Sequence, residues 1–84
     1  MKKYKPGTNS HKIFQLMDRA LAAGGDEIEV PQMYNRHNEP LGRNTFSMFM
    51  RRVRIDNFPD VDFYTRTRRD RVLVMGVRKP ESDS

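Results

Sequence analysis

The chain has 84 residues and no cysteine, and 32% of its residues are charged against 36% that are hydrophobic. This length accommodates one small domain, and the absence of cysteine excludes a disulfide framework and a thiolate metal site. No apolar run approaches the length of about 20 residues that spans a bilayer, and no signal-peptide core follows the first lysines, so the sequence predicts a cytoplasmic protein without a membrane partner.

Positive charge is concentrated at the N-terminus and in the C-terminal half. The net charge is +5 and the sequence pI is about 10.0. Residues 1–12 carry four lysines and no acid, and residues 43–79 carry ten cations, nine of them arginine, against four acids. Arginine offers a fork of donors that fits phosphates and guanine edges. The distribution favours a nucleic-acid partner, and the alternative is that the high pI only serves solubility.

The first predicted elements are a basic arm and a helix. Residues 1–8 are expected to form a flexible arm that contains Lys2, Lys3 and Lys5 and ends near a Pro-Gly breaker. Asn9 or Ser10 is expected to cap the helix. Its apolar residues recur at the spacing of one helical face, at Ile13, Leu16, Met17, Ala20 and Leu21. Two glycines, at 24 and 25, are expected to end it.

A short strand and a second helix are predicted next. Residues 26–30 alternate acidic and apolar side chains, which indicates a short strand. Pro31 fits the first turn of a helix over residues 32–37, because its missing N–H is not needed there. Met33 and Tyr34 would pack against the remainder of the protein.

The clearest helical pattern follows a turn at residues 38–42. Asn44 is the expected N-cap, Asn57 is expected to end the helix in left-handed geometry, and Phe58 is expected to fold back as an apolar contact. One face carries the apolar stripe Phe46, Phe49, Met50 and Val53. The opposite face displays Thr45, Met48, Arg51, Arg52 and Ile55, with Ser47 and Arg54 beside it.

A β-hairpin is predicted at the end of the chain. Residues 61–67 and 72–78 are β-prone and are joined by a polar connection of hairpin length. The second run is continuously apolar, so it is either buried on both faces or interrupted by a bulge at Gly76. Residues 80–84 are expected to be an acidic, disordered tail.

This order of elements resembles the winged helix-turn-helix family over residues 9–79. The resemblance implies an α+β fold of three helices, with a short strand after the first helix and a C-terminal β-hairpin that forms the wing. It also implies that residues 44–56 form a recognition helix in the major groove and that residues 66–71 form the tip of the wing. The turn at residues 38–42 is longer than is usual between such helices. The small size and the basic arm also resemble those of small phage or plasmid regulators.

The candidate DNA-binding residues follow from the chemistry of the major groove, which admits a helix with a polar, cationic face. The predicted recognition helix, the wing tip and the arm supply three groups of candidates. They are Arg43, Asn44, Thr45, Ser47, Met48, Arg51 and Arg52; Arg66, Arg68, Arg69 and Arg71; and Lys2, Lys3 and Lys5. For the arginines, the alternative is a solvated face with local ion pairs.

Catalytic and metal sites are not expected. His11 and His37 lack a cysteine or a suitably spaced carboxylate, so the sequence predicts no metal ion. Ser10 stands beside His11, but no third group orients the pair into a nucleophilic arrangement. The sequence therefore predicts a protein that is not an enzyme and has no cofactor.

The leading hypothesis is a sequence-reading protein that binds double-stranded DNA, a transcriptional regulator associated with the nucleoid. One alternative is a protein-interaction module on the same fold, such as an antirepressor or an inhibitor of a host enzyme, that grips an acidic partner; Met48 and Ile55 favour it. A second alternative is a binder of structured RNA, whose A-form major groove is too narrow for a helix. The sequence leaves open the target sequence, the direction of regulation and the oligomeric state, including a homodimer.

Overall fold

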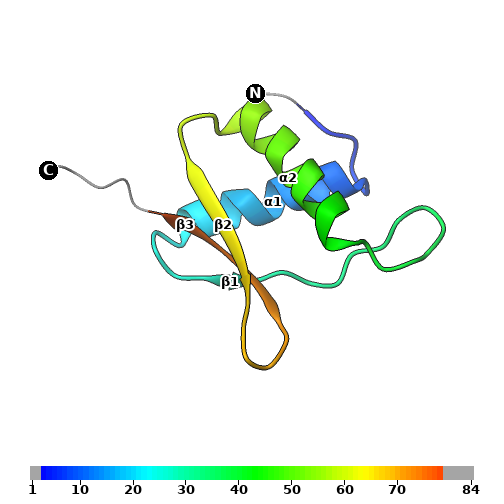
Figure 1. Cartoon of the computed structure of the whole chain (residues 1–84). Helices are drawn as coiled ribbons and strands as arrows, with labels where there is room; N and C mark the ends of the chain where they lie inside the picture. The colour runs from blue at the N-terminus through cyan, green and yellow to red at the C-terminus, as the bar shows by residue number, and fades with distance from the viewer. Residues whose placement is uncertain (1–2, 79–84) are drawn as a thin grey trace, which may run out of the picture. The chain divides into compact units, whose positions relative to one another are not determined.

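The computed structural model describes residues 3–78 and places them in an α+β arrangement. The elements in chain order are α1 (Asn9–Ala22), β1 (Ile28–Glu29), α2 (Arg43–Asn57), β2 (Asp62–Thr67) and β3 (Leu73–Arg78) (Figure 1). Within this described part there are two helices and one three-stranded antiparallel sheet. The predicted α+β class is therefore confirmed, whereas the predicted number of helices is wrong.

The described residues divide into two compact units. Residues 3–15 and 31–59 form the first unit, which contains the beginning of α1 and all of α2. Residues 16–30 and 60–78 form the second, which contains the sheet. The buried apolar side chains of the first are Ile13, Met33, Phe46, Val53 and Phe58, and those of the second are Leu16, Met17, Ala20, Val30, Phe63, Val74 and Met75.

A threonine caps the start of α1. The Thr8 hydroxyl oxygen accepts a hydrogen bond from the backbone N–H of His11 at 3.2 Å. This satisfies one of the N–H groups that have no partner within the helix. The predicted cap at Asn9 or Ser10 is therefore wrong, because both residues already belong to the helix. At the other end, Gly24 has a φ of +76°, as expected for a residue that follows a helix.

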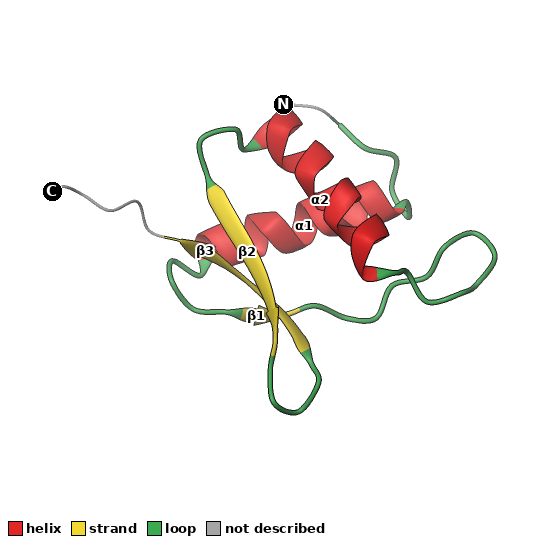
Figure 2. Cartoon of the chain, in the orientation of Figure 1, coloured by secondary structure: helices red, strands yellow, loops and turns green. Residues whose placement is uncertain are grey.

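The predicted helix over residues 32–37 does not form. Figure 2 shows the segment between β1 and α2 as a loop, and its regular feature is an isolated bridge between Tyr34 and Pro40. The backbone N–H of Leu41 donates to the carbonyl of Met33 at 2.8 Å, so the two ends of the loop lie side by side. Buried Met33 fixes the base of this loop.

Side-chain hydrogen bonds from Asn35 explain why this helix is absent. The Asn35 side-chain oxygen accepts hydrogen bonds from the N–H of His37 at 2.8 Å and of Glu39 at 3.0 Å. Such bonds offer the backbone an alternative to helical pairing. Asn38 adopts a φ of +61°, a left-handed conformation that asparagine tolerates. A six-residue helix would also form few backbone hydrogen bonds to set against its nucleation cost.

The ends of α2 differ from the prediction by small, local changes. The helix begins at Arg43, and Gly42 occupies the N-cap position without a side-chain hydrogen bond, so the predicted cap at Asn44 is wrong. Asn57 belongs to the helix and does not have the predicted left-handed conformation; in the described chain, the non-glycine residues with positive φ are Asn38 and Arg71. Its side-chain nitrogen donates instead to the carbonyl of Val53 at 3.1 Å.

The apolar stripe of α2 faces inward as predicted, although to different depths. Phe46 and Val53 are buried, with 6% and 1% of their surface exposed, whereas Phe49 and Met50 are half-buried. Phe58 follows the helix, folds back as expected and stacks on Phe14 with ring centroids 5.6 Å apart. The burial of one face leaves the opposite face of α2 exposed.

The sheet has β3 in its centre, in the order β1-β3-β2. The β2–β3 pairing runs without interruption from Asp62 opposite Arg78 to Thr67 opposite Leu73, so there is no bulge at Gly76. Successive side chains of a strand point to opposite faces of the sheet, and the neighbours Val74 and Met75 are 1% and 0% exposed. Of the two alternatives for this run, burial on both faces is confirmed.

Gly76 has a packing role within the sheet. It lies directly opposite Tyr64, and a Cβ added at Gly76 would come within 2.6 Å of the Tyr64 hydroxyl. The missing side chain lets the tyrosine lie across β3. Its hydroxyl thereby reaches Glu27, next to β1, and donates a hydrogen bond of 2.8 Å.

Candidate nucleic-acid interface

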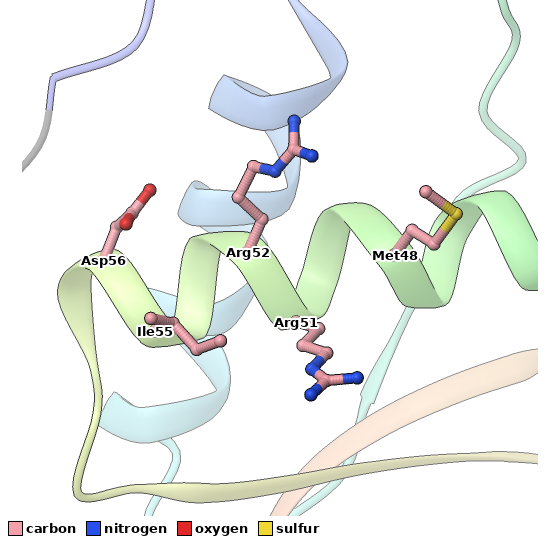
Figure 3. A pocket seen from close by; sticks show the side chains of 5 residues that line it. All are labelled: Met48, Arg51, Arg52, Ile55 and Asp56. Carbon is pink, nitrogen blue, oxygen red and sulfur yellow. The ribbon is translucent and has the colours of Figure 1, made fainter.

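The exposed face of α2 carries the residues that the sequence predicts for reading a groove. Thr45, Ser47, Arg51 and Arg52 are exposed, and so is Asn44 in the first turn. Met48 and Ile55 lie on the same face with 65% and 53% of their surface exposed. Figure 3 shows the arginine and apolar side chains extending from neighbouring turns of this helix.

Two arginines of this face are available for an external ligand. In residues 3–78, Arg51 and Arg52 make no ion pair or side-chain hydrogen bond, whereas Arg54 donates to the carbonyl of Pro59 at 3.4 Å. The two free arginines line an open hollow together with Met48, Ile55 and Asp56 (Figure 3). The hollow therefore combines two cations with apolar surface and one acid at its end.

The start of α2 adds backbone donors to this face. Gly42 caps the helix without a side-chain acceptor, and the N–H of Phe46 is the first that bonds back into the helix, to the carbonyl of Gly42 at 2.9 Å. The preceding N–H groups of the first turn have no partner within the helix. Together with Thr45 and Ser47, they offer donors to an anion at this end.

In the second unit, the hairpin arginines are not equivalent. Arg66 forms a two-pronged ion pair with Glu27, with its Nε 2.7 Å from Oε2 and its Nη2 2.6 Å from Oε1. Arg68 pairs with Asp70 through Nε and Nη2 at 3.2 Å and 2.9 Å, and with Glu29 at 2.9 Å. These two arginines tie the hairpin to β1. For Arg66 and Arg68, the structure therefore shows the local ion pairs that the sequence analysis gave as the alternative to DNA contact.

The ionisation of Glu27 maintains this arrangement. The hydrogen bonds from Arg66 and then from Tyr64 lower the pKa of Glu27 to about 2, from an ordinary value of 4.5. The hydrogen bond from Arg68 likewise lowers the pKa of Asp70. Both carboxylates therefore remain charged at neutral pH and hold their arginines.

The remaining arginines lie at the tip of the hairpin. Arg69 and Arg71 are exposed and make no ion pair within the described residues. The loop is closed by hydrogen bonds of 2.9 Å from the N–H of Arg71 to the carbonyl of Arg68 and from the N–H of Arg68 to that of Val72. Arg71 has a φ of +67° at the position where such loops ordinarily carry glycine.

Replacement of this strained arginine is expected to stabilise the fold. We expect Arg71→Gly to raise the free energy of unfolding by about 0.5–1 kcal/mol, because glycine accepts positive φ without steric cost but is more flexible when unfolded. Chemical denaturation would measure the change. Arg69→Gly is the matched control, since Arg69 has no positive φ to relieve and should gain no stability. Equal stabilisation by both substitutions would contradict strain at Arg71.

The N-terminal arm contains a residue for which the sequence predicts no role. Tyr4 is half-buried, and its hydroxyl accepts a hydrogen bond from Asn57 at 2.9 Å and donates to Asp56 at 3.5 Å. Lys3 and Lys5 on either side are exposed, whereas Lys2 lies outside the described residues. Arg43, which the sequence also predicts to bind DNA, is exposed and interacts with another part of the protein.

Two other kinds of feature are absent from residues 3–78. In this part of the chain, no group of three or more histidine, cysteine or acidic side chains could hold a metal ion. No described helix is both long and apolar enough to cross a bilayer. The acidic tail predicted at residues 80–84 lies outside the described residues.

Comparison with models of protein families, with curated proteins and with solved structures gives no match. The resemblance to winged helix-turn-helix proteins therefore rests on the order of elements, from which the second helix is missing. What the fold defines is a small α+β protein with an exposed, cationic helix face and an arginine-bearing hairpin.

Proposed function

We propose that this chain is a double-stranded DNA-binding protein that places α2 in the major groove and acts as a transcriptional regulator. The observation that carries the proposal is the exposed face of α2, on which Arg51 and Arg52 have no partner in the described chain. Unpaired arginines cost no intramolecular bond when they bind a ligand. The helix has 15 residues, a length of about 22 Å, and the groove is about 12 Å wide.

The chemistry of this face fits base edges as well as phosphates. Arginine makes two-pronged hydrogen bonds to guanine, and exposed apolar groups such as Met48 and Ile55 fit the thymine methyl. Thr45, Ser47 and the backbone N–H groups of Asn44 and Thr45, which have no partner within the helix, suit backbone phosphates. Since the helix predicted over residues 32–37 is absent, the proposal places α2 alone, rather than a pair of helices, at the groove.

The hairpin tip is proposed to bind phosphate as a separate surface. Its contribution comes from Arg69 and Arg71, because Arg66 and Arg68 would first have to break or share their ion pairs. Of the four arginines predicted to contact DNA at the wing tip, two are therefore proposed to do so. The arm adds Lys2, Lys3 and Lys5 to the proposed phosphate contacts.

Binding to duplex DNA is expected to depend strongly on salt. If these cations neutralise about six phosphates, the logarithm of the association constant should fall with the logarithm of salt concentration at a slope of about −5. Fluorescence anisotropy with a mixed-sequence duplex would measure it. A slope near zero, or no binding at about 50 mM salt, would contradict the proposal.

A second candidate function is binding to an acidic protein. The exposure of Met48 and Ile55 at 65% and 53% supports it, because exposed apolar side chains next to cations are also found at protein interfaces. The same measurement discriminates the two, since this candidate predicts no appreciable affinity for duplex DNA. A preference for structured RNA would instead indicate contact through the hairpin and arm without α2.

A further inference from the structure

One tyrosine connects the N-terminal arm to the C-terminal end of α2. The Tyr4 hydroxyl lies 2.9 Å from the side-chain nitrogen of Asn57 and 3.5 Å from a carboxylate oxygen of Asp56. Its ring lies 6.1 Å from that of Phe14, which in turn stacks on Phe58. The tyrosine therefore has both polar and aromatic partners. Its polar partners in α2 are more than 50 residues away in the sequence.

The arm is held at a second point, near the start of α1. Both the backbone N–H and the hydroxyl of Thr8 donate to the carbonyl of Lys5, at 3.2 Å and 2.7 Å. The same threonine caps α1 through the N–H of His11. Lys5 thus lies between two fixed points of the chain, and Lys3 is the immediate neighbour of Tyr4.

We infer that Tyr4 is a positioning residue that holds Lys3 and Lys5 beside the exposed face of α2, where they bind phosphates of the duplex that α2 reads. This inference rests on the proposed function. Asp56 provides the geometric link, since it accepts the Tyr4 hydrogen bond and also lines the hollow with Arg51 and Arg52. The arm therefore passes the end of the proposed reading face.

Anchoring changes what these lysines contribute to binding. A flexible arm must be ordered when it binds, and that loss of entropy weakens the complex. With Tyr4 in place, much of the ordering has already occurred in the free protein. The arm lysines are then expected to contribute about as much as cations on regular elements.

The test compares Tyr4→Phe with its matched control, Tyr34→Phe, in the full chain. Tyr4→Phe keeps the ring but removes the hydroxyl hydrogen bonds to Asn57 and Asp56. Tyr34 is 49% exposed, and its hydroxyl has no partner among the described residues. With a mixed-sequence duplex of about 20 base pairs as the probe, Tyr4→Phe should weaken binding about threefold to tenfold and leave the salt slope unchanged. Backbone relaxation measured by NMR should show increased mobility at Lys3 and Lys5.

A double-mutant cycle separates positioning from a general effect on the fold. In a Lys3→Ala, Lys5→Ala background, whose salt slope should be shallower by about two, Tyr4→Phe should have no further effect on affinity. The same loss in both backgrounds, or mobile lysines with unchanged affinity, would overturn the inference alone. Failure of the wild-type protein to bind duplex DNA would overturn the proposed function as well.

Discussion

Phe46→Ala is expected to destabilise the protein by about 3–5 kcal/mol, a large part of its stability. Phe46 is 6% exposed on the inner face of α2, and truncation of a buried phenylalanine removes both transfer free energy and packing contacts. A chain of 84 residues has a free energy of unfolding of about 4–12 kcal/mol. Chemical denaturation, or refolding yield if the variant is largely unfolded, would measure the loss.

Two other residues of the same helix serve as controls for this prediction. Phe49 is half-buried, so Phe49→Ala should cost clearly less than Phe46→Ala, although the sequence alone predicts equal burial. Ile55 is 53% exposed, so Ile55→Ala should change stability by no more than about 0.5 kcal/mol. Wild-type stability in Phe46→Ala, or a large loss in Ile55→Ala, would mean that α2 is oriented differently.

Elements with a repeated local pattern could be predicted from the sequence. The apolar spacing of α1 and α2 predicted both helices, and two β-prone runs around a polar turn predicted the hairpin. The exposed face of α2 followed from the same periodicity, because burial of Phe46 and Val53 turns Arg51 and Arg52 outward. Leu21 departs from the predicted apolar face of α1, being 40% exposed.

The missing second helix shows where local patterns compete. Pro31 and two apolar residues favoured a helix, but Asn35 and Asn38 favour turns, and Pro40 follows soon after. The side-chain hydrogen bonds of Asn35 prevailed over a helical segment with few possible backbone bonds. The density of asparagine and proline in residues 35–40 was the signal that should have predicted a loop.

Contacts between distant residues could not be predicted from spacing. Arg66 and Glu27 are 39 residues apart, and Tyr4 and Asn57 are 53 apart. Their proximity depends on strand order and on the path of the arm, neither of which has a local sequence signal. As a result, four hairpin arginines looked alike in the sequence, although two of them hold acids of the β1 segment.

The second large effect is expected at the exposed face of α2, which is proposed to read DNA. Arg51→Ala and Arg52→Ala should each weaken binding to a preferred DNA site by about 1–3 kcal/mol, or about 5- to 150-fold, because each would remove the proposed two-pronged contact to guanine. On random DNA the loss of affinity should be small, since one arginine–phosphate contact contributes much less to binding than a two-pronged contact to guanine. Arg36→Ala is the matched control, because Arg36 is an exposed arginine of the same unit outside α2.

The central claim, that α2 reads DNA sequence, is tested most directly by the ratio of specific to random binding. A duplex selected by the wild-type protein from a random-sequence library and a scrambled version of it would be titrated with wild type, Arg51→Ala, Arg52→Ala and Arg36→Ala at one salt concentration. We predict that the ratio falls at least about fivefold for the two α2 variants and stays at the wild-type value for Arg36→Ala. Equal losses on both duplexes, or the absence of any selected sequence, would contradict the claim.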